Sequence, residues 1–281
     1  MEVGIGLPTT IPGVTGAQVL EWARRAEARG FSSLGTIDRL VYANYEPLIA
    51  LAAAAAVTER IKLATTILIA PYRANGALVA KQAATLDNLS GGRLVLGVAV
   101  GGREDDYEVS GVDFHTRGKR FDAMLAEWDE LWSGDRVGPP GRPTLILGGT
   151  VDASYERAAR YGDGWTLGGG TPDAFAGGME KMRAAWSAAG RDGEPRGMSL
   201  AYYALGDGAQ AAAEGYLGDY YGFLGDYAAQ IAASAATDAD TVRGYVQGFD
   251  AAGCDELILF PSNPDPGQVD LLADALDLQA A

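Results

Sequence analysis

Basic residues, cysteines and histidines are scarce in this chain of 281 residues. Only 22 lysines and arginines stand against 37 acidic residues, so the formal net charge is −15. Proteins that bind nucleic acid or anionic membranes present basic surfaces, and we therefore expect neither partner. In other respects the composition is that of a folded protein, because 48% of the residues are hydrophobic and can build a large core.

The single cysteine, Cys254, and the single histidine, His115, narrow the chemistry further. One cysteine excludes an intramolecular disulfide and a thiolate-based zinc site. One histidine excludes a multi-histidine metal site, so we predict no bound metal. His115 remains a candidate catalytic base, although a lone histidine in a loop more often serves hydrogen bonding or packing.

Targeting and membrane signals are also missing. The first residues, Met1–Gly4, lack the basic and apolar regions of a signal peptide. The apolar run 50–57 ends at Thr58, well short of the length that spans a membrane. We expect a cytoplasmic protein.

Short apolar runs alternate with longer amphipathic segments along the whole chain. The runs that predict strands are residues 3–7, 32–37, 61–69, 94–100, 144–147, 165–167, 198–205 and 257–260. The segments that predict helices are 16–29, 46–58, 77–89, 119–132, 152–161, 172–189, two or three helices within 208–252, and 268–278.

This alternation predicts an α/β fold, a (β/α)8 TIM barrel that forms a single domain over residues 1–281. Strict strand–helix alternation implies parallel strands with right-handed crossovers, and eight units in this length match a barrel. A doubly wound open sheet is the alternative. Its usual glycine fingerprint is absent after the first run, where Gly4–Pro8 lacks the required spacing.

In such a barrel the active site lies at the carboxyl ends of the strands. Gly148, Gly149 and Thr150 follow the fifth run and precede a predicted helix. Two glycines permit close backbone approach, and a helix N-terminus attracts phosphate. The alternative is a tight turn in which Thr150 or Asp152 caps the helix.

Charged and aromatic residues follow other runs. Asp38 and Arg39 come after the second run, where a salt bridge or a substrate contact is expected, and Arg117 begins a basic segment. The acidic residues 104–106 form a solvated loop or a cation site. The aromatic residues Tyr202, Tyr203, Tyr220, Tyr221 and Phe223 line a pocket or pack in the core.

One long segment, AKQAATLDNLSGGRLVLGV at 80–98, closely resembles the bacterial luciferase-like flavin-dependent oxidoreductases. Further matching segments follow in the family's order. They are residues 30–31, 59–65, 111–118, 147–150, 158–165 and, more weakly, 252–257. Taken together, this ordered set covers most of residues 1–167 and independently favours a barrel.

The resemblance implies that FMN or the deazaflavin coenzyme F-420 binds at the barrel mouth. The cofactor ring is expected against Thr65, Thr66 and Ile67, with a non-prolyl cis peptide between Thr66 and Ile67. The cofactor phosphate is expected near Gly148, Gly149 and Thr150, within reach of Arg117. Gly101, after the fourth run, is a further candidate cofactor contact.

The chain departs from the family pattern at Arg39, where many members carry a histidine. Arginine is not a base at neutral pH, because its pKa lies above 12. Together with Asp38 and His115 it is a candidate catalytic residue, with the role of stabilising an anionic reduced flavin or substrate.

Four functions remain open. The first is a monooxygenase that uses reduced FMN and oxygen on a small organic substrate, with a flavin reductase as a partner. The second is an F-420-dependent reductase or dehydrogenase; we rank it lower because an oligoglutamate tail prefers a basic surface and this chain is acidic. The third is a non-catalytic flavin-binding protein. The fourth is a hydrolase, which would need paired carboxylates at the strand ends. The resemblance also suggests a homodimer.

Overall fold

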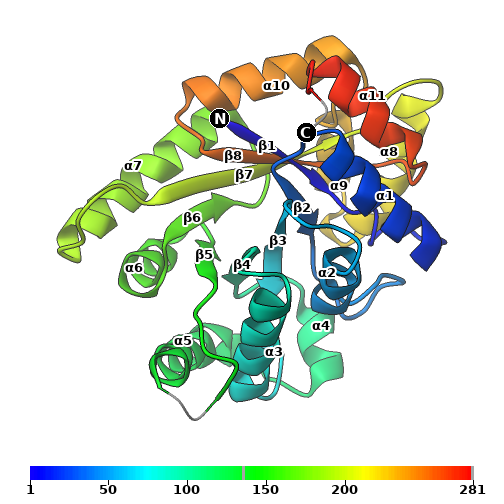
Figure 1. The fold of residues 1–281 in the computed structure, drawn as a ribbon. Helices are drawn as coiled ribbons and strands as arrows, with labels where there is room; N and C mark the ends of the chain where they lie inside the picture. Colours follow the sequence, from blue (N-terminus) through cyan, green and yellow to red (C-terminus); the bar gives the residue numbers. More distant parts are fainter. Residues whose placement is uncertain (135–136, 280–281) are drawn as a thin grey trace.

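The computed structural model describes residues 1–134 and 137–279. Eight parallel strands close into a barrel in chain order, and the last strand pairs with the first (Figure 1). The strands are β1 (Glu2–Gly6), β2 (Ser33–Thr36), β3 (Lys62–Ile69), β4 (Leu94–Ala99), β5 (Thr144–Gly148), β6 (Gly164–Leu167), β7 (Arg196–Tyr203) and β8 (Glu256–Pro261). The predicted single-barrel fold is therefore confirmed.

Helices surround this barrel, and most of them match the predicted segments. The helices that follow the eight strands are α1 (Gly16–Ala28), α2 (Pro47–Ala55), α3 (Gly76–Leu89), α5 (Arg117–Ser133), α6 (Asp152–Tyr161), α7 (Pro172–Ala188), α10 (Ala239–Ala251) and α11 (Gly267–Ala275). Two further helices, α8 (Ala209–Tyr220) and α9 (Tyr227–Ala233), lie between β7 and α10, so the prediction of up to three helices in 208–252 is confirmed.

Three short elements were not predicted. They are α4 (Glu104–Ser110) and two 3-10 turns, η1 (Phe114–Thr116) and η2 (Gly222–Leu224). The acidic residues 104–106 form the first turn of α4 instead of a loop, a position that favours negative charge because the backbone N–H groups there point outward. No helix of the described residues is long and apolar enough to cross a membrane.

The layer between strands and helices is packed with aromatic side chains near the fifth and sixth units. Trp165 of β6 is fully buried, with Tyr155 of α6 and Phe175 of α7 on either side at ring-centroid distances of 5.6 and 5.8 Å. Burial of side chains this large contributes roughly 2–3 kcal/mol each. The indole N–H of Trp165 donates to the carbonyl of Gly149 at 2.7 Å, so this packing also fixes the turn after β5.

Strand β3 is irregular at the place where the cofactor ring is expected. Its pairing with β4 shifts register between Thr65 and Leu68, and the Thr66–Ile67 peptide is cis, as predicted. The Thr65 hydroxyl donates to the carbonyl of Gly97 at 2.7 Å. A Cβ at Gly97 would lie 2.1 Å from the Thr65 carbonyl oxygen, so only glycine permits β3 and β4 to approach this closely.

Candidate active site at the barrel mouth

A hollow of about 330 Å³ opens at the carboxyl ends of β3, β4, β5 and β6. This mouth hollow is lined by Ile67, Ala99, Val100, Gly101, Gly148, Gly149, Thr150, Thr166, Leu167, Gly168 and Gly169. Its size lies within the range of small-molecule sites. Five of the residues predicted to contact a cofactor meet here from three loops that are distant in the sequence, namely Ile67, Gly101, Gly148, Gly149 and Thr150.

The turn after β5 leaves a helix N-terminus open. Gly149 has a φ of +124°, and a Cβ there would lie 2.4 Å from the Ser154 hydroxyl, so the turn requires glycine. The prediction that Thr150 or Asp152 caps α6 is wrong, because the N-cap is Val151 and no side chain bonds to the first turn. The first-turn N–H groups of α6 therefore keep the hydrogen-bonding capacity that an anion uses.

A buried hydroxyl without a partner marks the same hollow. Thr166 of β6 is 2% exposed, and its Oγ1 has no hydrogen-bond partner in the structure. Buried polar groups nearly always have partners, so an exception beside a hollow suggests a ligand. We did not predict this residue. The signal was available in the strand alternation, because Trp165 packs outward against α6 and α7 and its neighbour must point inward.

Asp38 lies just past β2 and is almost completely enclosed. Its Oδ2 accepts the backbone N–H of Ile69 at 2.9 Å and pairs with Arg73 at 3.0 Å. Burial raises the pKa of the Asp38 carboxyl, and the positive charge of Arg73 opposes this rise. These contacts tie the end of β2 to the end of β3, so Asp38 positions the irregular segment of β3 against which a cofactor ring is expected.

Arg39 and Arg103 form a second group at the mouth. Arg39 pairs with Asp105 at 2.7 Å and lies over the ring of Tyr42. Arg103 donates to the carbonyl of Tyr220 at 2.9 Å, and burial lowers the pKa of its guanidinium. Each arginine has one buried nitrogen without a partner, Nε in Arg39 and Nη1 in Arg103.

His115 and Arg117 are not among the residues that line the mouth hollow. His115 is exposed in η1 and contacts Phe114 edge to face. Arg117 donates to the carbonyl of Phe114 at 2.8 Å, and its guanidinium carbon lies 3.7 Å from the centre of the Phe114 ring. Their predicted roles in catalysis and phosphate binding stay predictions.

The aromatic residues after β7 pack mainly in the interior, and they join α8 and η2 to the mouth. Tyr202, Tyr203 and Tyr220 are at most 6% exposed, whereas Phe223 is 51% exposed. The Tyr202 and Tyr221 hydroxyls lie 2.7 Å apart, and Tyr42 donates to Asp219. Residues 209–224 therefore cover the side of the mouth that the hollow leaves free.

Metal chemistry finds no support in the described part of the chain, where no group of three or more His, Cys, Asp or Glu side chains could hold a metal ion. The acids of α4 have other partners: Asp105 pairs with Arg39, and Asp106 accepts the backbone N–H groups of Leu40 and Val41.

The fold and the mouth hollow together define a class, the (β/α)8 barrels that bind a phosphorylated ligand at the carboxyl ends of their strands. Comparison with known sequences sharpens this assignment. The profile of the luciferase-like monooxygenases matches residues 1–248, and the chain belongs to this family.

Curated relatives match part of the chain. An uncharacterized protein of Mycobacterium tuberculosis is 36% identical over 189 residues, which cover 54% of this chain and 65% of that protein. The F420-dependent glucose-6-phosphate dehydrogenase of Amycolatopsis mediterranei is 31% identical, covering 52% of each chain. Pyrimidine monooxygenase RutA of Escherichia coli is 35% identical, covering 53% of this chain and 47% of its own. These matches span less than two thirds of each relative's length.

Solved structures share the whole barrel. An F420-dependent secondary alcohol dehydrogenase superimposes with a TM-score of 0.85 at 20% identity, covering 99% of this chain and 98% of its own. The monooxygenase RslO1 of Streptomyces bottropensis gives 0.80 at 22% identity, covering 98% of both chains. At these identities the likeness establishes the fold.

Proposed function

We propose that this protein is a flavin-dependent oxidoreductase that holds FMN or the deazaflavin F-420 in the mouth hollow and acts on a small organic substrate. One observation carries the proposal. The uncapped N-terminus of α6, the glycine turn at Gly149 and the unpartnered hydroxyl of Thr166 all face one hollow. This arrangement fits a phosphate at the helix end and a ring deeper in the barrel.

In this proposal the cofactor supplies the redox chemistry, and the chain supplies position and electrostatics. The N–H groups of α6 hold the phosphate, and Ile67 and Gly101 bound the ring. Asp38, fixed by Arg73 and Ile69, keeps the end of β3 in place. The guanidinium groups of Arg39 and Arg103 provide a positive field at the mouth, which favours an anionic reduced ring or substrate.

Paired ligands with and without the phosphate test the proposal. Titration of the purified protein with reduced FMN and reduced riboflavin compares them directly. Charge-assisted hydrogen bonds contribute about 1.5–3 kcal/mol, so we expect FMN to bind at least about tenfold more tightly. The same comparison applies to F-420 and its phosphate-free chromophore. Equal affinity for both members of each pair would contradict the phosphate site.

The second candidate is a non-catalytic flavin-binding protein. Arg39, which stands where relatives carry a histidine, is occupied by Asp105 and so offers no proton acceptor. Turnover separates the two candidates: an enzyme yields an oxidised or reduced organic product, whereas a binding protein returns the cofactor unchanged. A flavin reductase as partner belongs to the FMN version of the proposal.

We also propose a homodimer. Ile49 of α2 is 69% exposed, and Leu78 and Leu89 of α3 are 52% and 77% exposed. Helices α2 and α3 pack side by side, so these side chains form one apolar face. Sedimentation equilibrium at micromolar concentration should give twice the chain mass, and Leu78→Lys should shift the protein toward monomer.

A further inference from the structure

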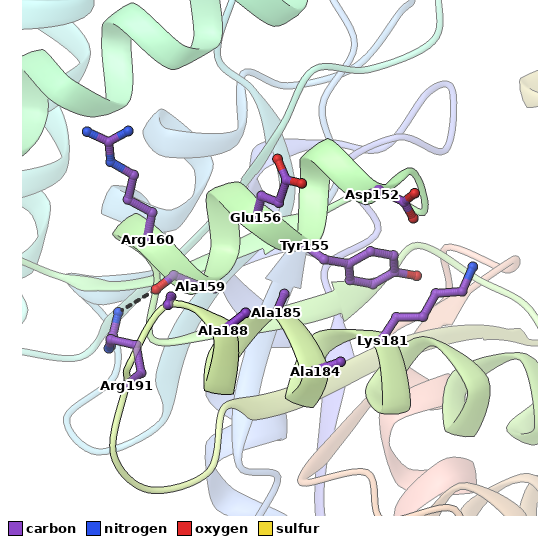
Figure 2. A pocket seen from close by; sticks show the side chains of 11 residues that line it. Asp152, Tyr155, Glu156, Ala159, Arg160, Lys181, Ala184, Ala185, Ala188 and Arg191 are labelled. Atoms are coloured by element: carbon purple, nitrogen blue, oxygen red, sulfur yellow. Dashed lines mark hydrogen bonds between the residues drawn. The ribbon is translucent and has the colours of Figure 1, made fainter.

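The mouth hollow continues into the space between α6 and α7. A second hollow of about 290 Å³ shares Thr150 and Leu167 with it. A third, of about 690 Å³, shares Tyr155 and Lys181 with the second and runs farther along the two helices. Figure 2 shows this outer groove, with α6 on one side and α7 on the other. The shared residues make a path from the helix N-terminus to the outside of the barrel.

Alanines of α7 form the long side of the outer groove. Ala184, Ala185 and Ala188 present only methyl groups there, and Tyr155 of α6 lies across the groove near Lys181 (Figure 2). Lys181 and Ala188 are seven residues apart, which is about 10 Å along the helix axis. A smooth side of this length accommodates an extended chain of a few residues.

The charges along the outer groove favour an anion on the α7 side. Lys181 is exposed where the second and third hollows meet, and Arg191 closes the far end with hydrogen bonds to the carbonyls of Ala159 and Gly162. The opposing acids are on α6, where Glu156 is exposed and points away from α7 (Figure 2). The lining groups are three basic and two acidic residues, in a chain whose net charge is −15.

The two candidate cofactors differ at this point. FMN ends at its phosphate, so it would occupy the mouth hollow and leave the outer groove empty. In F-420 the phosphate is esterified and carries an oligoglutamate tail, which needs an exit beside the phosphate. We propose that the outer groove binds this anionic tail, with Lys181 as its first contact, and that the cofactor is therefore the deazaflavin. This inference rests on the proposed function and reverses our sequence-based preference for FMN.

Binding measurements on the full chain test the inference without any turnover. The protein is titrated, with cofactor fluorescence as the readout, with three ligands: F-420 with several glutamates, its tail-less form that ends at the lactyl group, and FMN. We expect the tailed form to bind about tenfold more tightly than the tail-less form, the effect of two or three surface ion pairs. The advantage should level off after the first few glutamates and shrink at high salt.

Variants of α7 assign the effect to the outer groove. Lys181→Ala should weaken binding of the tailed form about twofold to fivefold, the range of one exposed ion pair, and leave the tail-less form unchanged. Ala184→Phe, at an exposed position that lines the groove, should block the tail with the same selectivity. Arg183→Ala removes the same charge from α7 at a residue that pairs with Glu194 and does not line the groove, so it should change neither affinity.

Equal affinities for the tailed and tail-less forms would overturn the inference and leave the phosphate site intact. Tighter binding of FMN than of tailed F-420 would do the same. If none of the three ligands binds, the proposed function itself fails, and the inference fails with it. Tail-dependent binding that is lost in Lys181→Ala and kept in Arg183→Ala would support both.

Discussion

The ion pair of Asp38 and Arg73 permits a quantitative test of how the mouth is held together. The Asp38 side chain is 1% exposed and the Arg73 side chain 17%, and their atoms lie 3.0 Å apart. Arg73→Met removes the cation and leaves the buried carboxylate with hydrogen bonds from Ile69 and Tyr72. Breaking a buried pair from one side costs about 3–5 kcal/mol. The lost contact of Arg73 with the more exposed Glu46 adds at most about 1 kcal/mol.

The loss should depend on pH with a definite sign. Burial raises the pKa of Asp38 in the folded state, and removing Arg73 raises it further. Between the unfolded and the folded pKa the folded state binds more protons, so stability falls as pH rises through this window and is constant above it. Arg73→Met should therefore be most destabilising at neutral pH. The difference from the wild-type protein should shrink toward about pH 4, near the unfolded pKa.

Urea unfolding at pH 7.5 and pH 4.5, followed by tryptophan fluorescence, measures both effects. The double variant Asp38→Asn/Arg73→Met provides the control, because it removes the buried charge together with its partner and should recover part of the stability at pH 7.5. The reasoning is refuted if Arg73→Met loses the same free energy at both pH values, or if the double variant is no more stable than the single one at pH 7.5.

Three further substitutions probe the mouth. Gly149→Ala should lower the free energy of unfolding by about 1–3 kcal/mol and weaken cofactor binding, because alanine disfavours a φ of +124°; Gly168→Ala, where a Cβ meets nothing within 4 Å, is the matched control for thermal melts and titration. Thr166→Val should leave stability unchanged and weaken cofactor binding by about 0.5–1.5 kcal/mol, and unchanged binding would remove Thr166 from the site. Tyr221→Phe leaves the buried Tyr202 hydroxyl unpaired and should cost about 1–3 kcal/mol in urea unfolding, whereas an unchanged midpoint would show that water replaces the bond.

The alternation of apolar runs and amphipathic segments was enough to predict the barrel. Each strand is a short β-branched or aliphatic stretch, and each helix carries one apolar face, so local periodicity specifies both kinds of element. The glycine turn at 148–149 and the position of Thr150 beside a helix N-terminus were readable for the same reason. Short elements such as α4 escaped prediction because seven residues hold too little periodicity.

Other features depend on which residues the barrel brings together. Arg73 reaches Asp38 across 35 positions of sequence, and Arg103 reaches Tyr220 across 117. The cap of α6 was mispredicted because capping residues were near in sequence, yet the chain enters the helix through Val151.

The sequence by itself determined the order of strands and helices, the edge of the barrel that carries the site and the irregular strand β3, because these follow from local patterns and from the family resemblance. Only the tertiary structure decided that Thr166 has a buried, unpartnered hydroxyl and that three hollows join along α6 and α7. The physical reason is that partners and cavities are set by packing between distant segments, which no local pattern encodes.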